Sequence, residues 1–426
     1  MKPPAIPALP ASSVWSDVAL LLLPALCLAI PGGYSYGAGV LLLTSLLGAR
    51  IWWFKGKSLP LQAWQLYLSA MLLALSWLLD SMLSHAGGSA VEKPLKIAFT
   101  LPCYFYLMWR PPRIQWLWTG TVAGSLAACV VAFWQIATAS DPTPYIRTNG
   151  FTNAIQFGNL ALLLGMLALC AWNAPPSHAV RWQWRALLGV AFTAGLVVSL
   201  LSGSRGGWLA LVLLLGLQMV YWSMHGHWRS VMLASVVLAV ALLGVLAIPK
   251  LNLQNRLNEA TNEIDKYHNR GKANTSVGAR LQMWKFASGL YQQRPILGWS
   301  QKGYMEQVSQ AITTEKLDPR IATYDHPHNE VLDSASKRGT VGLLLLLGIY
   351  CAPLWVFGKL FRNSRDPHLR AVCAAGMLLP LSYAFFGLTE AFLPHNSAST
   401  FYFYMLPLLW GSSWGIRKQN LLLTDN

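Results

Sequence analysis

The stretch GTVGLLLLLGIYCAPLWVFGKLF, residues 339–361, decides the class of fold, because Lys359 is its only charged residue. An α-helix rises about 1.5 Å per residue, so this run is long enough to cross a bilayer core of roughly 30 Å. The rest of the chain has the same character, since 54% of its 426 residues are hydrophobic and only 11% are charged. Soluble domains contain about a quarter charged residues. The sequence therefore predicts an all-α polytopic membrane protein.

Apolar runs recur along the whole chain and predict about twelve transmembrane helices. Their expected ranges are 16–31, 34–53, 61–80, 94–109, 115–138, 153–172, 186–203, 206–224, 229–248, 339–361, 368–388 and 396–416. We expect residues 1–248 to form the first nine helices, and residues 249–338 to form one large, partly helical loop outside the membrane. Residues 339–426 then form the last three helices and a short cytoplasmic tail.

Basic residues are spread unevenly over the short turns, and this bias predicts the orientation of the chain. With a cytoplasmic N-terminus, one side carries fifteen basic residues and the opposite short turns carry four. The fifteen are Lys2, Arg50, Lys55, Lys57, Arg110, Arg113, Arg181, Arg185, Arg229, Lys359, Arg362, Arg365, Arg370, Arg417 and Lys418, and the four are Lys93, Lys96, Arg147 and Arg205. We therefore expect cytoplasmic termini and an outward 249–338 loop. The net charge of +16 reflects this topology and requires no nucleic-acid partner.

Four ionisable residues from separate parts of the chain fall on the expected outer face. They are Arg205 in LLSGSRGGWLAL, Arg280 in NTSVGARLQMW, His328 in DHPHNEVLD and Glu390 in FFGLTEAFLPHN. Ionisable residues at the membrane edge are functional candidates by default. Each also has a structural explanation: Arg205 as a snorkelling side chain, Arg280 as a solvated helix charge, and Glu390 as a helix cap or interfacial acid. The glycines around Arg205 favour the close approach of a ligand.

The histidines of DHPHNEVLD allow two kinds of chemistry. With Asp325, His326 and His328 could bind a metal ion, but no third histidine or cysteine lies near in the sequence, so no metal site is predicted. Asp325 as N-cap and Pro327 in the first turn would start a helix that runs through NEVLDSASKR and ends at Gly339. The positive end of that helix would favour a neutral His328 ring, able to accept a proton.

All six cysteines lie inside apolar runs, and the 249–338 loop has none. Neither a disulfide framework nor a thiolate metal site is therefore predicted. We find no glycine-rich nucleotide-binding motif in the sequence, so we expect no cofactor and no ATP-driven pump.

Several motifs resemble those of the O-antigen ligase family, within the superfamily that also contains O-antigen polymerases and O-oligosaccharyltransferases. The most specific is HNEVLDSASKRGTVG, residues 328–342, in which His-Asn is followed by nine residues and a Gly-x-x-Gly. The segment 254–284 resembles the start of the ligase periplasmic loop, SGSRGG at 202–207 the arginine turn, and GFTNAIQFGNLA at 150–161 the turn before the sixth span. Where ligases often have aspartate before the last span, this chain has Glu390.

The resemblance implies a glycosyltransferase of the bacterial inner membrane whose active site, and with it the 249–338 loop, faces the periplasm. It would transfer a glycan from undecaprenyl pyrophosphate, embedded among the membrane lipids, to a sugar hydroxyl of lipid A–core oligosaccharide. Arg205 and Arg280 would clamp the pyrophosphate, and His328 would take the proton of the acceptor hydroxyl. Glu390 is the fourth catalytic candidate, and it or Asn329 would orient His328 or bind the acceptor. The substrate-binding candidates are Arg205, Arg280, Asn329, His326 and Arg147.

Three other functions fit the sequence less well. A polymerase of the same superfamily would join glycan repeat units to each other. A protein O-oligosaccharyltransferase would use a Ser or Thr hydroxyl and often carries an added soluble C-terminal region. A transporter would be expected to have broken helices and charges at the bilayer midplane, whereas the polar residues here gather at one face.

Overall fold

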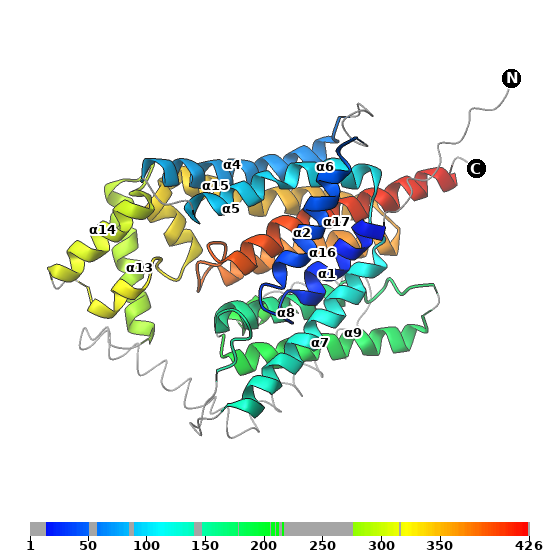
Figure 1. Cartoon of the computed structure of the whole chain (residues 1–426), viewed down its shortest axis with the longest axis horizontal. Helices are drawn as coiled ribbons and strands as arrows, with labels where there is room; N and C mark the ends of the chain where they lie inside the picture. The colour runs from blue at the N-terminus through cyan, green and yellow to red at the C-terminus, as the bar shows by residue number, and fades with distance from the viewer. Residues whose placement is uncertain are drawn as a thin grey trace.

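The computed structural model describes residues 14–50, 58–84, 89–139, 147–177, 179–204, 206–208, 210–212, 215–216, 276–314 and 317–424. Every regular element in these residues is a helix (Figure 1). The helices are α1 (Val14–Leu26), α2 (Tyr34–Leu47), α4 (Leu61–Leu83), α5 (Ser89–Ala98), α6 (Thr100–Trp109), α7 (Gln115–Thr138), α8 (Ala154–Leu169), α9 (Arg181–Ser202), α13 (Ser276–Gln293), α14 (Ser300–Thr313), the 3-10 helix η2 (Pro319–Thr323), α15 (Glu330–Asn363), α16 (Pro367–Phe386) and α17 (Asn396–Thr424).

Five of these helices are long and apolar enough to cross a membrane. They are found within α4, α7, α9, α15 and α16, and the shorter apolar helices α1, α2 and α8 lie beside them in the bundle. The prediction of an all-α membrane protein is thus confirmed in class. The number of twelve spans stays a prediction, because most of the expected spans at 206–224 and 229–248 lies outside the described residues.

The expected span at 94–109 is interrupted. Helix α5 ends at Ala98 and α6 begins at Thr100, with Phe99 between them at the N-cap position of α6 without a capping hydrogen bond from its side chain. Pro102 explains the break, because its ring has no N–H for the carbonyl of Ala98 and would clash with it. In the first turn of α6 the same proline is tolerated.

The basic turns meet at one end of the bundle. Arg113 forms an ion pair with Asp17 of α1 at 2.7 Å. Asn420 near the end of α17 donates a hydrogen bond to Asp366, the N-cap of α16, at 3.1 Å. A cavity of about 380 Å³ is lined by Arg113, Asp366 and Asn420 together. The turns that carry most of the expected cytoplasmic charges therefore share one end of the molecule.

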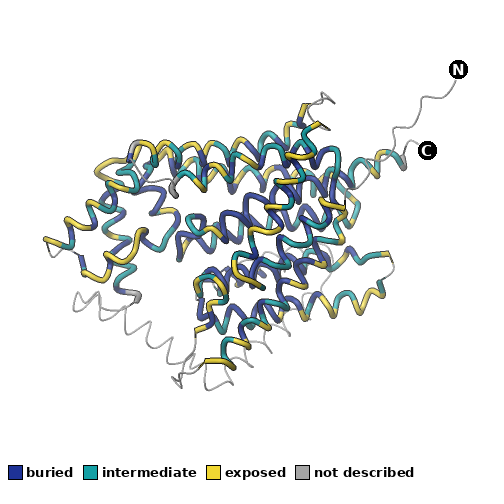
Figure 2. The backbone as a smooth tube through the Cα atoms, in the orientation of Figure 1, coloured by how far each residue is buried: buried dark blue, intermediate teal, exposed yellow. Residues whose placement is uncertain are grey.

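The other end of the bundle carries a small helical unit made of α13, α14 and η2 (left in Figure 1). These helices pack around their own apolar cluster, which includes Met283, Leu290 and Tyr304 and is separate from the large core of the bundle. Figure 2 shows buried backbone both in this unit and in the bundle. The backbone N–H of Gln301 donates to Asp80 of α4 at 3.0 Å, and that of Trp299 donates to Ser336 of α15 at 2.9 Å. The unit is thus fixed against the ends of two spanning helices.

Gly339 is the residue of α15 at which the helix packs closely against this unit. Its φ of +61° interrupts the helix, and a Cβ at this position would lie 2.3 Å from the carbonyl oxygen of Ile296. Thr340 donates its N–H to the carbonyl of Pro295 at 2.7 Å. The expected break at Gly339 is present, but the helix resumes immediately. The backbone at Pro295 and Ile296 lies against the break and accepts the hydrogen bond of Thr340 that the helix itself does not satisfy.

Candidate active site

The two histidines lie on a loop, residues 324–329, which precedes α15 and which we term the histidine loop. The expected cap at Asp325 is wrong: Asn329 is the N-cap, and its side chain accepts the N–H of Leu332 at 3.0 Å. The helix therefore begins at Glu330, and Pro327 lies outside it. His328 directly precedes the cap, so its ring lies beside the helix start rather than in the first turn.

His328 has a backbone φ of +50°, which is uncommon for a residue other than glycine. Its N–H donates to Nδ1 of His326 at 3.2 Å, and the two rings meet edge to face with centroids 4.6 Å apart. The ring of Tyr324 packs on His328 from another side, at 4.7 Å. The strained backbone of His328 is therefore held by contacts within the loop itself.

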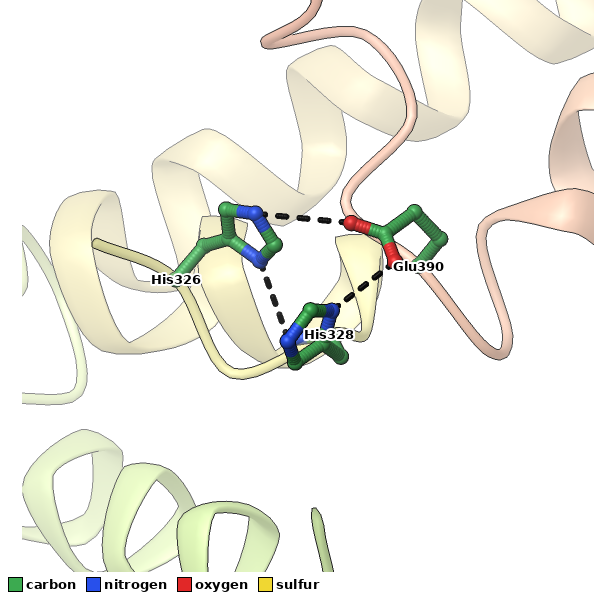
Figure 3. Close-up of side chains that lie close together, drawn as sticks. All are labelled: His326, His328 and Glu390. Carbon is green, nitrogen blue, oxygen red and sulfur yellow. Dashed lines mark hydrogen bonds and ion pairs between the residues drawn. The ribbon is translucent and has the colours of Figure 1, made fainter. Parts of the chain in front are cut away.

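Glu390, from the turn between α16 and α17, is the centre of the site (Figure 3). Its Oε2 lies 2.8 Å from Nδ1 of His328, and its Oε1 lies 3.4 Å from Nε2 of His326. Nε2 of His395 approaches the same Oε1 at 3.4 Å. One carboxylate that is only 2% exposed thus faces three imidazoles.

The charges of the site are set by burial and by these contacts. Burial alone would raise the pKa of Glu390, but hydrogen bonds from His328 and His395 and the charges of the imidazoles lower that pKa to about 2. Burial lowers the pKa of His326, against the opposing charge of Glu390. The site at neutral pH thus has an ionised Glu390 and a neutral His326.

These charges fix the tautomer of His328. An ionised carboxylate only accepts hydrogen bonds, so Nδ1 of His328 must carry the proton that points at Glu390. In the neutral ring, Nε2 then has a free lone pair. His328 is thus arranged to accept a proton at Nε2 while Glu390 stabilises the resulting imidazolium.

Three side chains hold the histidine loop by its carbonyl groups. Lys337 and Gln301 both donate to the carbonyl of Asp325, at 2.8 and 3.2 Å, and the indole of Trp284 donates to that of Pro327 at 2.9 Å. Lys337 is itself buried and forms an ion pair with Asp333. Sequence reasoning missed these contacts, because they come from α13, α14 and a later turn of α15.

The start of α15 also holds the turn that carries Glu390. The side-chain amide of Asn329 donates to the carbonyl of Leu388 at 3.0 Å, and the N–H of Glu330 donates to that of Gly387 at 2.7 Å. The carboxylate of Glu330 accepts the N–H of Leu393 at 2.9 Å. Asn329 and Glu330 thus fix both the histidine loop and the Glu390 turn to one helix end.

His395 was not among the residues singled out from the sequence. It faces Glu390, and its other ring nitrogen lies 3.5 Å from the amide of Asn153, the N-cap of α8. It therefore connects the site to the turn at 150–153, part of the expected outward turn before the sixth span. Its place five residues after Glu390 in FFGLTEAFLPHN was the available signal.

Of the three arginine candidates, the structure describes Arg147 and Arg280. Arg205 lies outside the described residues. Arg280 is half-buried on α13, one turn before Trp284 and so on the helix face that contacts the histidine loop. Arg147 donates from Nε to the carbonyl of Ser202, the first residue of the SGSRGG turn, at 2.6 Å. The structure thus gives Arg280 and Arg147 positions near the expected outer face.

The fold places a further possible metal ligand, Glu390, beside His326 and His328. One ligand atom from each of His326, His328 and Glu390 lies within 4.8 Å of the others. Imidazole and carboxylate ligands suit zinc and other transition metals. The prediction of no metal therefore no longer rests on the lack of a third ligand, and it needs a direct test.

Comparison with known proteins identifies the relatives of this chain. A family model described as O-Antigen ligase matches residues 188–347, which include the histidine loop. A protein of Haemophilus influenzae described as "Uncharacterized protein" is 25% identical over 378 residues, 88% of this chain and 92% of that protein. The O-antigen ligase of Escherichia coli K12 is 27% identical over 129 residues, 30% of each chain. The resemblance of this chain to the O-antigen ligase family is therefore confirmed, and residues 188–347 are the part of the chain that matches the family model.

Proposed function

We propose that this protein is an O-antigen ligase: a glycosyltransferase that transfers a glycan from undecaprenyl pyrophosphate to a sugar hydroxyl of lipid A–core oligosaccharide. The single observation that carries the proposal is the pairing of His328 with Glu390 at 2.8 Å. A sugar hydroxyl is a weak nucleophile, and a correctly oriented base makes it a stronger one. The pyrophosphate ester is already an activated leaving group, so the reaction needs no ATP.

The transfer is a single displacement at the anomeric carbon of the donor. The acceptor oxygen forms a bond to that carbon while the bond to the pyrophosphate oxygen breaks, and the electron pair leaves with undecaprenyl pyrophosphate. Nε2 of His328 takes the hydroxyl proton, and Glu390 stabilises the imidazolium across its 2.8 Å contact. Attack from the face opposite the leaving group inverts the anomeric centre.

The other candidates divide between binding and positioning. Arg280, on the helix face near the histidine loop, and Arg205 bind the pyrophosphate through two-pronged guanidinium contacts. Arg147 supports substrate binding beside the SGSRGG turn. His326 uses Nδ1 to accept the N–H of His328 and faces Glu390 with Nε2, so we assign it to positioning. Asn329 positions the two loops through its contact with Leu388.

We propose that the site faces the periplasm. The support is the separation of charges along the bundle: α15 and α16 run between the Glu390 site and a turn that carries Arg362, Arg365 and Arg370. Positively charged turns favour the cytoplasmic side. An outward site lies at the bilayer edge, where a lipid-linked donor reaches the protein while its sugars stay in water.

The test is transfer by the purified protein with the polyprenyl-pyrophosphate donor. His328→Asn, which tolerates a positive φ, should lower the transfer rate by roughly 10²–10⁴-fold while donor binding stays nearly unchanged. His368→Asn, at the opposite end of the bundle, is the matched control and should keep the wild-type rate. Transfer by His328→Asn within a few-fold of wild type would rule out the base.

Two further readouts distinguish the rival explanations. Excess chelator should leave the rate unchanged, whereas loss with rescue by one metal would make His326, His328 and Glu390 ligands. A deletion strain should lack all long lipopolysaccharide ladders and accumulate polyprenyl-linked polymer. Retention of a single repeat unit on the core would instead indicate a polymerase.

A further inference from the structure

A cavity of about 530 Å³ lies at the basic end of the bundle, between one end each of α4, α15, α16 and α17. Lys359 on α15 lines it, about 30 residues after the histidine loop. At 1.5 Å per residue, that distance along the helix is roughly 45 Å. The cavity is thus far from the site of the proposed transfer, and its function is a separate question.

The polar lining of this cavity is positively charged. Lys359, Arg365 and Arg417 line it, and Asp366 is the one carboxylate among its described lining residues, so three positive charges against one negative leave two in excess there. Asp366 is already engaged, because its oxygens accept the N–H of Leu369 at 2.8 Å and the amide of Asn420 at 3.1 Å. The three basic side chains form no ion pair with the described part of the chain. The lining therefore suits an anion.

Part of the cavity lining is apolar and exposed, and we term this part the apolar rim; the lining also includes the amides of Gln62, Gln65 and Asn363. Leu61, Trp355 and Leu421 line the cavity with 72%, 59% and 63% of their surface exposed. In a helix bundle embedded in a bilayer, such exposed side chains face lipid chains, and tryptophan prefers the depth of the head groups. The occupant must therefore combine a negative group with an apolar part.

We propose that this cavity binds an anionic phospholipid, with the phosphodiester between Lys359, Arg365 and Arg417 and the acyl chains along Leu61 and Trp355. Guanidinium groups bind phosphate oxygens in two-pronged fashion. Basic pockets between transmembrane helices are recognised sites for anionic head groups. A soluble anion would use the charges but not the exposed apolar rim, which is why we assign the cavity to a lipid.

The first experiment uses the full-length wild-type protein. The protein is transferred to nanodiscs of mixed phosphatidylglycerol and phosphatidylcholine, released into the gas phase, and the retained lipids are identified by native mass spectrometry. We expect retained phosphatidylglycerol to exceed its share of the mixture by at least tenfold. Retention in proportion to the mixture would overturn the proposal without requiring any variant to fold.

Paired variants locate the binding. Each basic side chain near an anionic head group contributes about fivefold in affinity, so Lys359→Gln combined with Arg365→Gln should lower phosphatidylglycerol retention by roughly 25-fold. Arg362→Gln is the matched control, since Arg362 is exposed on the same helix but does not line the cavity. An equal loss in the control would mean diffuse surface attraction and overturn the site.

A competition arm separates a lipid from a soluble anion. Inorganic phosphate at ten times the phosphatidylglycerol concentration should leave retention unchanged, because it makes no contact with the apolar rim. Displacement of the lipid by phosphate would show that charge alone is recognised. Trp355→Ala should reduce retention severalfold with the three basic residues intact, and unchanged retention would likewise exclude a lipid.

Discussion

At the scale of single residues, the site depends most on Glu390, because one carboxylate contacts three histidines. We expect Glu390→Gln to lower the transfer rate by roughly 10²-fold or more, since an amide removes the charge that stabilises the imidazolium and no longer fixes the tautomer. Glu390→Asp keeps the charge and should lose less. Initial rates and donor binding, measured together, check both. A Gln variant within a few-fold of wild type would contradict the pairing.

His326 gives a pH dependence of stability. Its pKa is lowered by burial from the ordinary 6.5, so the folded protein binds this proton less readily than the unfolded chain. This contribution to stability is complete above about pH 6.5 and decreases as the pH falls. We expect the thermal midpoint to fall between pH 7.5 and pH 5, and less steeply in His326→Gln. Parallel pH profiles for both proteins would contradict the assignment.

The sequence predicted the residue types, and the family resemblance left open whether Glu390 or Asn329 would orient His328. His328 and Glu390 were recognisable as polar residues at the edge of apolar runs. Their contact joins positions 62 residues apart, and nothing local in the sequence indicates it. The argument against a metal site counted only ligands near in the sequence, so it could not consider Glu390, and the absence of a metal stays a prediction.

At the scale of elements, the start of α15 organises both loops of the site. Asn329→Ser keeps an N-cap oxygen but loses the amide that donates to Leu388. We expect a stability loss of about 1 kcal/mol together with a severalfold fall in kcat, because Glu390 is no longer held against His328. Thermal unfolding and single-turnover rates measure the two effects.

The control is Asp366→Ser, which changes the N-cap of α16 at the other end of the bundle. It should affect stability with no change in kcat. If Asn329→Ser transfers glycan at the wild-type rate, the contact between the helix end and the Glu390 turn has no role in positioning.

Helix interiors followed from the apolar pattern, but helix ends did not. The break at Gly339 was predictable, since glycine favours a positive φ, yet the resumption of the helix depends on the Pro295–Ile296 backbone packed beside it. The N-cap of α15 is Asn329 and not the expected Asp325. We attribute the difference to the side chains of α13, α14 and α15 that bind the carbonyls of Asp325 and Pro327 in the histidine loop. Such contacts are tertiary and override local preferences.

At the scale of the whole molecule, the separation of the basic turns from the site predicts the accessibility of each end. In a background without the six native cysteines, Ser309→Cys on α14 should react with a membrane-impermeant thiol reagent in intact spheroplasts. Asn363→Cys, at the end of α15, should react only after the membrane is opened. Both positions lie on or beside exposed surface. The reverse labelling would place the site in the cytoplasm and exclude the proposed acceptor.

The sequence predicted the membrane class from its composition, and it predicted the gathering of polar candidates at one face from its apolar runs and the bias of its basic residues. It could not predict how α13 and α14 form a small unit that is fixed to α4 and α15 through Asp80 and Ser336. The apolar residues of that unit are too few and too interspersed with polar ones to resemble a span. Their shared core exists only once the chain has folded back.

The burial of α8 has a consequence for the order of biosynthesis. Every residue from Gln156 to Ala168 is buried, and the Asn159 side chain accepts a hydrogen bond from Ser204 at 2.6 Å. While the ribosome is still translating α9, that amide lies in the bilayer without this partner, and polar groups in such a state are costly. A nascent chain halted before Ser204 should therefore be degraded, whereas one that has passed this residue should persist in the membrane.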